Sequence, residues 1–186
     1  TSSFSMPSWQ VAMNELSNHD HSRFLTRTNH KVGRTNTLGP QAAEQGINKA
    51  VFREGVVIQM TWTGAPTIYY GDEAGVCGFT DPDNRRTYPW GHEDQVLLAF
   101  HKDIIRLRRE NEELRSGSLK MLESDYNFIS YGRFNRKGQC AVLINNNNHP
   151  ITKEIHVWEI GTPKTGKMKV ILQSRDDGYC MEGAEY

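Results

Sequence analysis

The chain contains 186 residues, of which 37% are hydrophobic and 10% aromatic, so it has enough apolar material for a sizeable globular core. Lysine and arginine number 22, as do aspartate and glutamate, and this balance gives no electrostatic reason to expect a nucleic acid or an anionic membrane as partner. Three widely spaced cysteines without C-x-x-C spacing argue against a disulfide framework and a structural zinc site.

No apolar run in the sequence approaches the roughly 18 residues of a membrane span. The N-terminal segment lacks a signal-peptide pattern and does not begin with methionine. We therefore interpret the sequence as a fragment of a longer chain, whose targeting signals would be missing. The odd cysteine count favours a reducing compartment, so we expect a cytoplasmic protein.

A short strand is predicted from Trp9 to Leu16, because apolar residues gather there. A dense polar cluster, residues 18–23, follows the end of this strand. After a loop at 29–40, apolar positions recur at helical spacing and predict one helix from Gln41 to about Thr63, with Pro40 before its first turn and Gly64 after its last.

A second strand and helix follow the same order. Residues 65–71 form a short apolar run that is typical of a strand buried on both faces. A long segment rich in Gly, Pro, Asp and Asn then covers 71–91, and loops of this length are usually functional or disordered. Its aromatic residues argue against disorder. Residues 94–115 predict a helix with an apolar stripe at Leu97, Phe100, Ile104 and Leu107.

Beyond Gly117 the pattern changes to β-rich runs separated by turns. The runs predict antiparallel strands at 127–135, 139–146 and 167–174. The chain order therefore indicates an α/β part over residues 1–117 and an all-β domain over 118–186.

Both polar segments come directly after a predicted strand, where the catalytic groups of parallel-sheet enzymes gather. We therefore expect residues 18–23 and 71–86 to share one site. Two strand–helix units are too few to close a barrel, which again indicates a fragment.

The individual residues leave alternatives open. Asp20 could cap a following helix, and His19 with His21 could be metal ligands that would need further partners. Asp81 and Arg85 combine an acceptor with a fork of donors that suits sugar hydroxyls, although their segment also reads as a turn. For Glu73 we favour a buried structural hydrogen bond over a place in the site.

Three stretches, NELSNHDHSRF, GAPTIYYGDEAG and DPDNRR with the YPW that follows, together resemble the α-amylase family of glycoside hydrolases, in particular its neopullulanase and cyclomaltodextrinase group. The resemblance implies that the chain holds the last two strand–helix units of a (β/α)₈ TIM barrel, followed by an antiparallel β-sandwich domain whose completeness stays open.

The resemblance also implies functional roles. Asp20 matches the carboxylate that stabilises the transition state, and His19 matches a histidine that binds the reacting sugar. Asp81 and Arg85 match residues that bind the neighbouring glucose, whereas Arg23 is expected to brace the loop. No motif for the nucleophile or the general acid is present, so the fragment alone should be inactive.

The leading hypothesis is thus a retaining glycoside hydrolase that acts on α-1,4-linked glucans of the starch or cyclodextrin type. No cofactor is expected; calcium use by a full-length enzyme stays open. An α-glucan should be the substrate, and the exposed barrel edge should favour a homo-oligomer. The alternatives are a non-catalytic carbohydrate-binding or interaction module, and a metal-dependent barrel hydrolase that uses His19 and His21.

Overall fold

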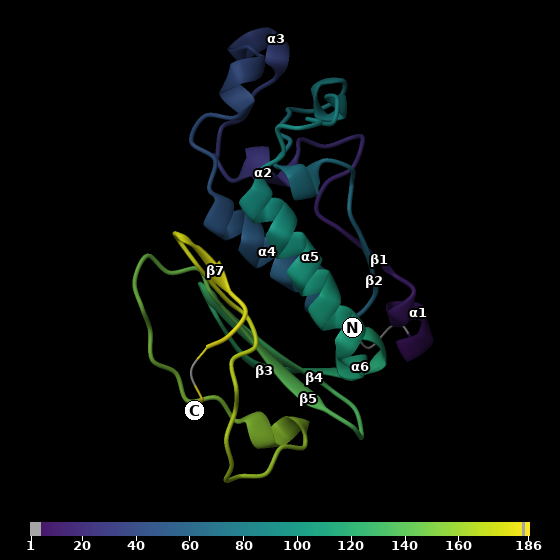
Figure 1. Cartoon of the computed structure of the whole chain (residues 1–186), viewed down its shortest axis with the longest axis vertical. Helices are drawn as coiled ribbons and strands as arrows, with labels where there is room; N and C mark the ends of the chain where they lie inside the picture. The colour runs from purple at the N-terminus through teal and green to yellow at the C-terminus, as the bar shows by residue number, and fades with distance from the viewer. Residues whose placement is uncertain (1–4, 184) are drawn as a thin grey trace.

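Two long helices form the centre of the molecule. The computed structural model describes residues 5–183 and 185–186. Helices α4 (Lys49–Thr61) and α5 (Gln95–Glu110) pack side by side, with a three-stranded sheet at one end and long loops at the other (Figure 1). Their buried apolar side chains form one core, which includes Phe52, Val56, Leu97 and Phe100.

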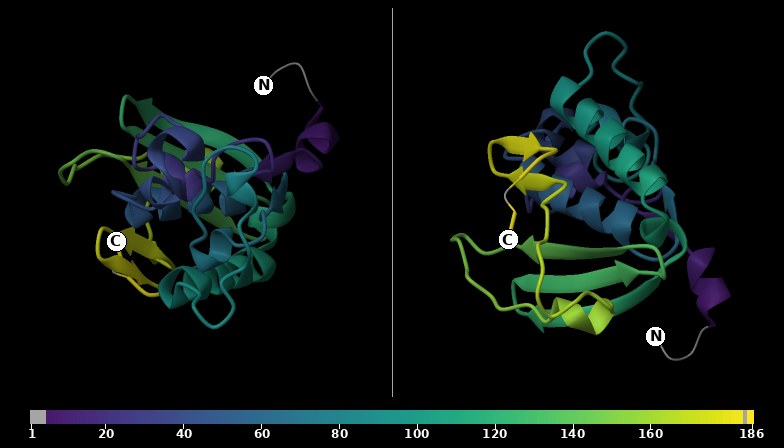
Figure 2. Two further views of the ribbon diagram at one scale, coloured as in Figure 1. Left: turned by 90° about the horizontal axis from the view of Figure 1, so that it is seen from above. Right: turned by 60° about the horizontal axis from the view of Figure 1, so that its bottom comes forward.

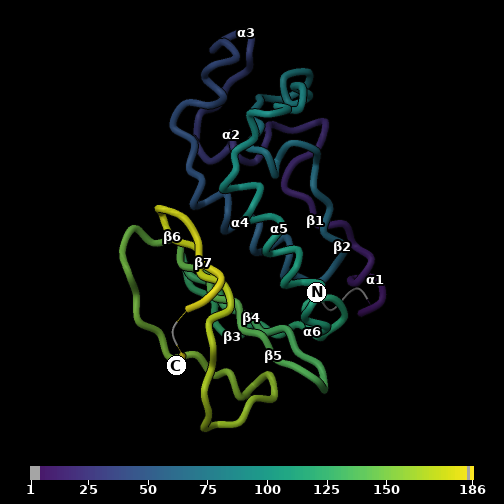
Figure 3. The backbone as a smooth tube through the Cα atoms, in the orientation of Figure 1, coloured from purple at the N-terminus to yellow at the C-terminus, as the bar shows by residue number. Residues whose placement is uncertain are grey.

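Two short parallel strands lie beside these helices. Strand β1 (Met13–Glu15) pairs with β2 (Ala65–Thr67), and Glu15 lies opposite Thr67 (Figure 3). The strand predicted from Trp9 is wrong in its first half, where helix α1 (Met6–Gln10) forms instead. Proline suits the first turn of a helix, and Pro7 occupies that place in α1.

Strand β2 is shorter and more exposed than its sequence predicts. Only three residues of the apolar run pair, Ala65 is exposed, and the run from Pro66 to Tyr69 is half-buried. In the described part of the chain β1 is the sole partner of β2 in its sheet, and no residue of β2 is fully buried, so the expected burial on both faces is not reached.

Helix α4 begins at Lys49, eight positions after the predicted start at Gln41. Pro40 instead opens a short 3-10 turn, η1 (Pro40–Ala43), and Gly46 follows with a φ of 73°, which a right-handed helix cannot include. The side chain of Asn48 then accepts hydrogen bonds from the first amides of α4.

The helix predicted at residues 94–115 is largely confirmed, but it forms two separate helices. Asp94 caps α5, and Leu97, Phe100 and Ile104 are buried as the apolar stripe predicts. At Asn111 the backbone leaves helical geometry, and a separate helix α6 (Glu112–Ser116) follows.

The C-terminal region forms antiparallel strands. Strands β4 (Phe128–Phe134) and β5 (Gln139–Asn145) match two of the predicted runs, and β3 (Ser118–Asp125) adds a third strand that the sequence reading missed. The run at 167–174 contributes to pairing mainly at its end, where β6 (Gln173–Arg175) joins β7 (Gly178–Cys180) in a separate hairpin. The chain passes from α6 to β3 at Gly117, but the division into two domains stays a prediction.

The three-stranded sheet packs on helix α4 rather than on a second sheet. Tyr131 lies edge-on to Trp62, with ring centroids 4.9 Å apart, and its hydroxyl oxygen is 2.6 Å from that of Thr61. The β6–β7 hairpin also packs on α4, beside the helices (Figure 2). A facing pair of sheets, as in a β-sandwich, therefore stays a prediction.

The remaining elements are single turns of helix within loops. They are α2 (Phe24–Arg27), α3 (Thr35–Leu38), η2 (Asp72–Ala74), η3 (Asp83–Arg85) and η4 (Val157–Ile160). Within residues 5–183 and 185–186, no helix is both long and apolar enough to cross a bilayer.

Candidate active site

The two polar segments meet at the C-terminal ends of the parallel strands. The chain leaves β1 at Glu15 and enters the polar cluster, and it leaves β2 at Thr67 and enters the loop at 71–94. This loop projects at the same end of the molecule as α3, away from the three-stranded sheet (Figure 1). The geometry joins the two segments as their sequence positions predict.

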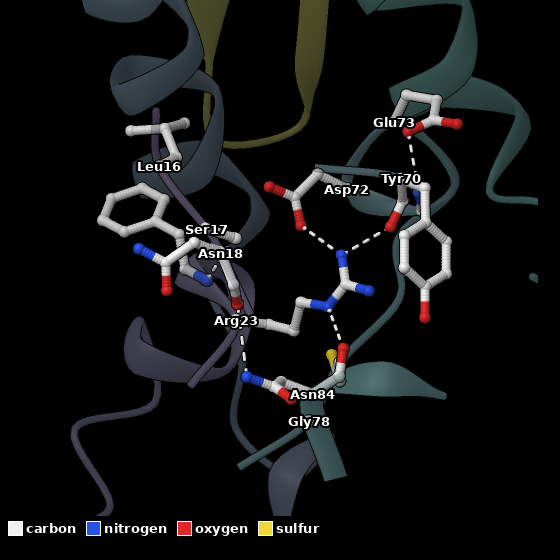
Figure 4. Close-up of polar contacts among 12 residues, drawn as sticks. Leu16, Ser17, Asn18, Arg23, Tyr70, Asp72, Glu73, Gly78 and Asn84 are labelled. Carbon is white, nitrogen blue, oxygen red and sulfur yellow. Dashed lines mark hydrogen bonds and ion pairs between the residues drawn. The ribbon is translucent and has the colours of Figure 1, made fainter. Parts of the chain in front are cut away.

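A buried arginine fastens the two segments to each other. The Arg23 side chain has no exposed surface and donates hydrogen bonds to the backbone carbonyls of Asn84 (2.8 Å) and Tyr70 (2.6 Å) (Figure 4). Its Nη1 also lies 3.0 Å from the carboxylate of Asp72, and its guanidinium packs over the ring of Tyr69. Arg23 therefore braces the loop, as predicted.

Asn84 completes this fastening from the opposite side. Its buried side-chain amide donates to the carbonyls of Asn18 (3.2 Å) and His21 (2.9 Å). Asn18 in turn accepts hydrogen bonds from the backbone amides of Asp20 and His21, which closes a tight turn. The backbone of residues 18–21 is thus held from both sides.

The carboxylate of Asp20 is open to solvent at this turn. Its side chain is 68% exposed and lies 3.5 Å from Nε2 of His19. It does not cap helix α2, because the first helical amide, that of Phe24, donates to the hydroxyl of Ser17 instead. The capping alternative for Asp20 is therefore wrong, and its side chain is free to meet a ligand.

Arg85 reaches across from the second segment to the first. It forms an ion pair with Asp81, one turn earlier, and its Nη2 lies 3.5 Å from the backbone carbonyl of His19. Hydrogen bonding to Asp81 raises the pKa of Arg85, which stays a cation. The structure thus places all four predicted site residues, His19, Asp20, Asp81 and Arg85, at one end of the strand pair.

The neighbouring Asp83 and Arg86 turn away from the site and fix the loop. Asp83 accepts from the amide of Phe79 (2.7 Å) and from Arg86 (3.0 Å). Arg86 also pairs with Glu44 and donates to the carbonyl of Pro40, both at 2.6 Å. Arg85 therefore contacts the candidate site residues, whereas Arg86 fixes the loop on which Asp81 and Arg85 lie.

Two acidic residues after β2 serve the framework. Burial raises the pKa of Asp72, and hydrogen bonds from Ser17 and Arg23 oppose that shift. Glu73 accepts a hydrogen bond from the amide of Gly71 at 2.9 Å. This contact confirms the structural hydrogen bond favoured for Glu73, although the bond is partly and not fully buried.

The family model for the α-amylase catalytic domain matches residues 2–94, a range that includes both strands and both polar segments. The chain belongs to the α-amylase family.

Relatives within the α-amylase family include an amylopullulanase from Thermoanaerobacter thermohydrosulfuricus, 37% identical over 70% of this chain and 9% of the relative. A cyclomaltodextrinase from Thermoanaerobacter pseudethanolicus is 36% identical over 95% of this chain and 28% of the relative. A solved Nostoc punctiforme debranching enzyme shares the fold, with a TM-score of 0.71 and 23% identity over 95% of this chain and 34% of that one. The chain therefore spans about a third or less of the length of these proteins.

A metal site at His19 and His21 would need further ligands in this α-amylase family chain. No group of three or more His, Cys, Asp or Glu side chains could hold a metal ion among the residues that the structure describes. His19 and His21 thus have no third ligand in that part of the chain.

The sequence reading missed the residues that position this α-amylase family site. Asn84 and Asp72 are buried polar residues whose partners lie on the first segment, 49 or more positions away in the chain. In the sequence, Asn84 and Asp72 are marked only by their place in a long loop after a strand. Polar residues on the surface can share that place, so it does not distinguish the two.

Proposed function

We propose that this chain is part of the catalytic barrel, with the adjoining β domain, of a retaining hydrolase that acts on α-1,4-linked glucans. The observation that carries the proposal is the meeting of two segments at one strand end, with the exposed carboxylate of Asp20 on one and the Asp81–Arg85 pair on the other. Family membership and the names of the relatives support the substrate class.

The strand pattern fits the (β/α)₈ barrel part of the proposal. Each of the parallel strands β1 and β2 is followed by a loop and then by a long helix, α4 or α5, in the order that a barrel repeats. In this arrangement the functional loops gather at the C-terminal ends of the strands, where the polar segments lie. We assign residues 1–117 to the barrel and 118–186 to a β-sandwich domain.

Asp20 is assigned to stabilisation of the transition state. Glycoside cleavage builds positive charge on the sugar ring, and a fixed carboxylate favours that charged state over the neutral ground state. The Asn18 turn holds the backbone of Asp20, and the exposed side chain leaves room for a sugar beside it. This preorganisation is what electrostatic stabilisation requires.

His19, Asp81 and Arg85 are assigned to sugar binding. Arg85 offers several donors in a fixed plane, and Asp81 and His19 add an acceptor and a ring nitrogen. A glucose ring has hydroxyls of both donor and acceptor character around its rim, which this mixture can match. The ion pair between Asp81 and Arg85 fixes the position of each side chain relative to the other.

The experiment that tests this function is Asp20→Asn in the full-length enzyme that carries this chain. We expect kcat on maltooligosaccharides to fall by about 10² or more, with a smaller change in KM, because the lost interaction is strongest in the transition state. Asp177→Asn, an exposed carboxylate in the β6–β7 turn, is the matched control and should leave kcat unchanged. Near-normal turnover in Asp20→Asn would remove the catalytic assignment.

A further inference from the structure

The loop that carries Asp81 and Arg85 ends in an exposed tryptophan that the proposed site does not use. The Trp90 side chain is 79% exposed, whereas Tyr88 and Pro89 beside it are half-buried. A large apolar side chain so open to water is informative, since most tryptophans are largely buried. The exposed indole face of Trp90 is therefore available to a ligand.

Trp90 is held by an ordered turn. Its amide donates to the carbonyl of Tyr88 (3.0 Å), and the amide of His92 donates to that of Pro89 (2.8 Å). Gly91 supplies the φ of 78° that this turn requires and that a side chain would strain. The indole is thus presented by a fixed backbone.

Tyr88 supports the indole from beside it. The two ring centroids are 4.5 Å apart, with 47° between the ring planes. Burial and the nearby carboxylate of Glu73 raise the pKa of Tyr88, and Glu73 accepts a hydrogen bond from the amide of Gly71, four positions after the end of β2. The aromatic pair is therefore anchored at the strand end where the candidate site lies.

The aromatic pair and the proposed sugar-binding residues Asp81 and Arg85 lie on the same loop. Arg85 lies five positions before Trp90, and the hydroxyl of Tyr70 fixes the chain between them by donating to the carbonyl of Arg86 at 2.9 Å. The whole segment projects at one end of the molecule (Figure 1). One loop at one end of the molecule therefore carries both the Asp81–Arg85 pair and the exposed indole.

We propose that Trp90, supported by Tyr88, is a stacking platform for a glucose ring beyond the one bound by Asp81 and Arg85. The inference rests on the proposed function and adds a binding position to it. One side of a glucose ring is a sheet of C–H groups, and a flat, rigid indole offers a large apolar surface to such a face. Its contribution should therefore grow with the length of the substrate.

Trp158, which is also exposed, differs in this respect. The ring of His156 stacks on it, with centroids 4.3 Å apart, and the amine of Lys164 lies 5.8 Å from its ring centre. Its indole is therefore already in contact with neighbours on the β side of the molecule. This difference makes Trp158→Ala a matched control.

The test compares maltotriose with maltohexaose and maltoheptaose as substrates of the full-length enzyme. We expect Trp90→Ala to lower kcat/KM for the longer substrates about tenfold through KM, with little change for maltotriose. Trp90→Phe should restore most of the loss, and Trp158→Ala should match the wild type. An equal loss on all lengths, or no loss on the longer ones, would overturn the platform.

Binding measured without turnover provides the second readout. In an Asp20→Asn background, titration calorimetry with maltoheptaose should show a weaker Kd when Trp90→Ala is added. If the wild type neither binds nor hydrolyses maltooligosaccharides, the proposed function itself fails, and the platform with it. If the wild type is active and Trp90→Ala changes only the sedimentation coefficient, Trp90 contacts protein and the platform alone is wrong.

Discussion

At the scale of single residues, the site depends on side chains that never reach the solvent. Arg23 links three backbone or carboxylate groups of the second segment, and Asn84 links the second segment back to the first. The exposed groups that we assign to substrate contact, such as Asp20, take the position of their backbone from these contacts. A guanidinium suits this task because its planar fork can donate in several directions at once.

Replacing Arg23 should therefore destabilise the folded site as a whole and not only remove one contact. Arg23→Ala leaves Asp72 as an uncompensated buried carboxylate, and we expect a loss of about 3–5 kcal/mol in the free energy of unfolding. Arg23→Lys should also destabilise, because one ammonium cannot span the same partners. Urea unfolding of the wild type and variants measures this loss. Arg27→Ala, an exposed neighbour, should cost much less, and equal costs would contradict the bracing role.

At the scale of elements, helix α4 contacts the second long helix, the three-stranded sheet and the β6–β7 hairpin. Its inner face joins the core with α5, its end meets the three-stranded sheet, and the β6–β7 hairpin lies along it. Arg53 donates to the hydroxyl of Ser174 at 2.9 Å, which docks the hairpin. The adjacent Glu54 is half-buried, and its burial together with the charge of Asp176 in the β6–β7 turn raises its pKa to about 7.

The stability of the chain should therefore depend on the ionisation of Glu54. Folding raises the pKa of this carboxyl from 4.5 to about 7, so folding favours the protonated form. Its stabilising contribution is complete below pH 4.5 and is lost as the pH rises through about 7. Glu54→Gln should reduce the loss of stability between about pH 5 and pH 8 by about 1 kcal/mol, a value discounted because the side chain is half-exposed.

Urea unfolding at the two pH values checks this dependence. Glu110→Gln, an exposed carboxylate near the end of α5, is the control and should follow the wild type. If Glu54→Gln loses as much stability as the wild type over the same range, folding does not raise the pKa of Glu54.

At the scale of the whole molecule, Arg133 joins the three-stranded sheet to helix α4, and Arg108 joins helix α5 to α4 and α6. Arg133 donates to the carbonyls of Thr61 (2.5 Å) and Gly117 (3.0 Å), and Arg108 donates to those of Met60 and Leu114, both at 2.7 Å. Burial and the charge of Arg108 lower the pKa of Arg133 to about 10. The carbonyl groups at helix ends bind these cations well, since the helix dipole is negative there.

The chain by itself should not hydrolyse α-glucans. A retaining reaction needs two carboxyl groups across the bond besides the stabilising one, and the sequence provides no motif for either. Reducing-sugar assays on starch, maltoheptaose and β-cyclodextrin should show no release above the background set by the Asp20→Asn chain. Release that Asp20→Asn abolishes would contradict this expectation.

The chain should also self-associate through the edge beside β1. Val11 is 77% exposed and Met13 61% exposed there, and β1 pairs on one side only in the described sheet. We expect a dimer or higher oligomer in sedimentation velocity, and a smaller species when both residues are changed to lysine. Val32→Lys, on a distant loop, is the control. A monomer at high wild-type concentration would contradict this expectation.

What the sequence determined by itself was local. The spacing of apolar residues and the turn residues between them located α5, β4 and β5. The polar runs after the two strands marked the residues that converge, among them Asp20 and Arg85. These features depend on neighbours within a few positions. The start of α4 could also have been found, since Gly46 and Asn48 are local signals.

Only the tertiary structure decided which residues hold the site together. Arg23 meets the carbonyl of Asn84 across 61 positions of chain, and Tyr131 meets Thr61 across 70. No local pattern encodes such pairs, because a buried polar side chain is defined by the partner that folding brings to it. The short extent of β1 and β2 has the same cause, since a strand is only as long as the partner beside it.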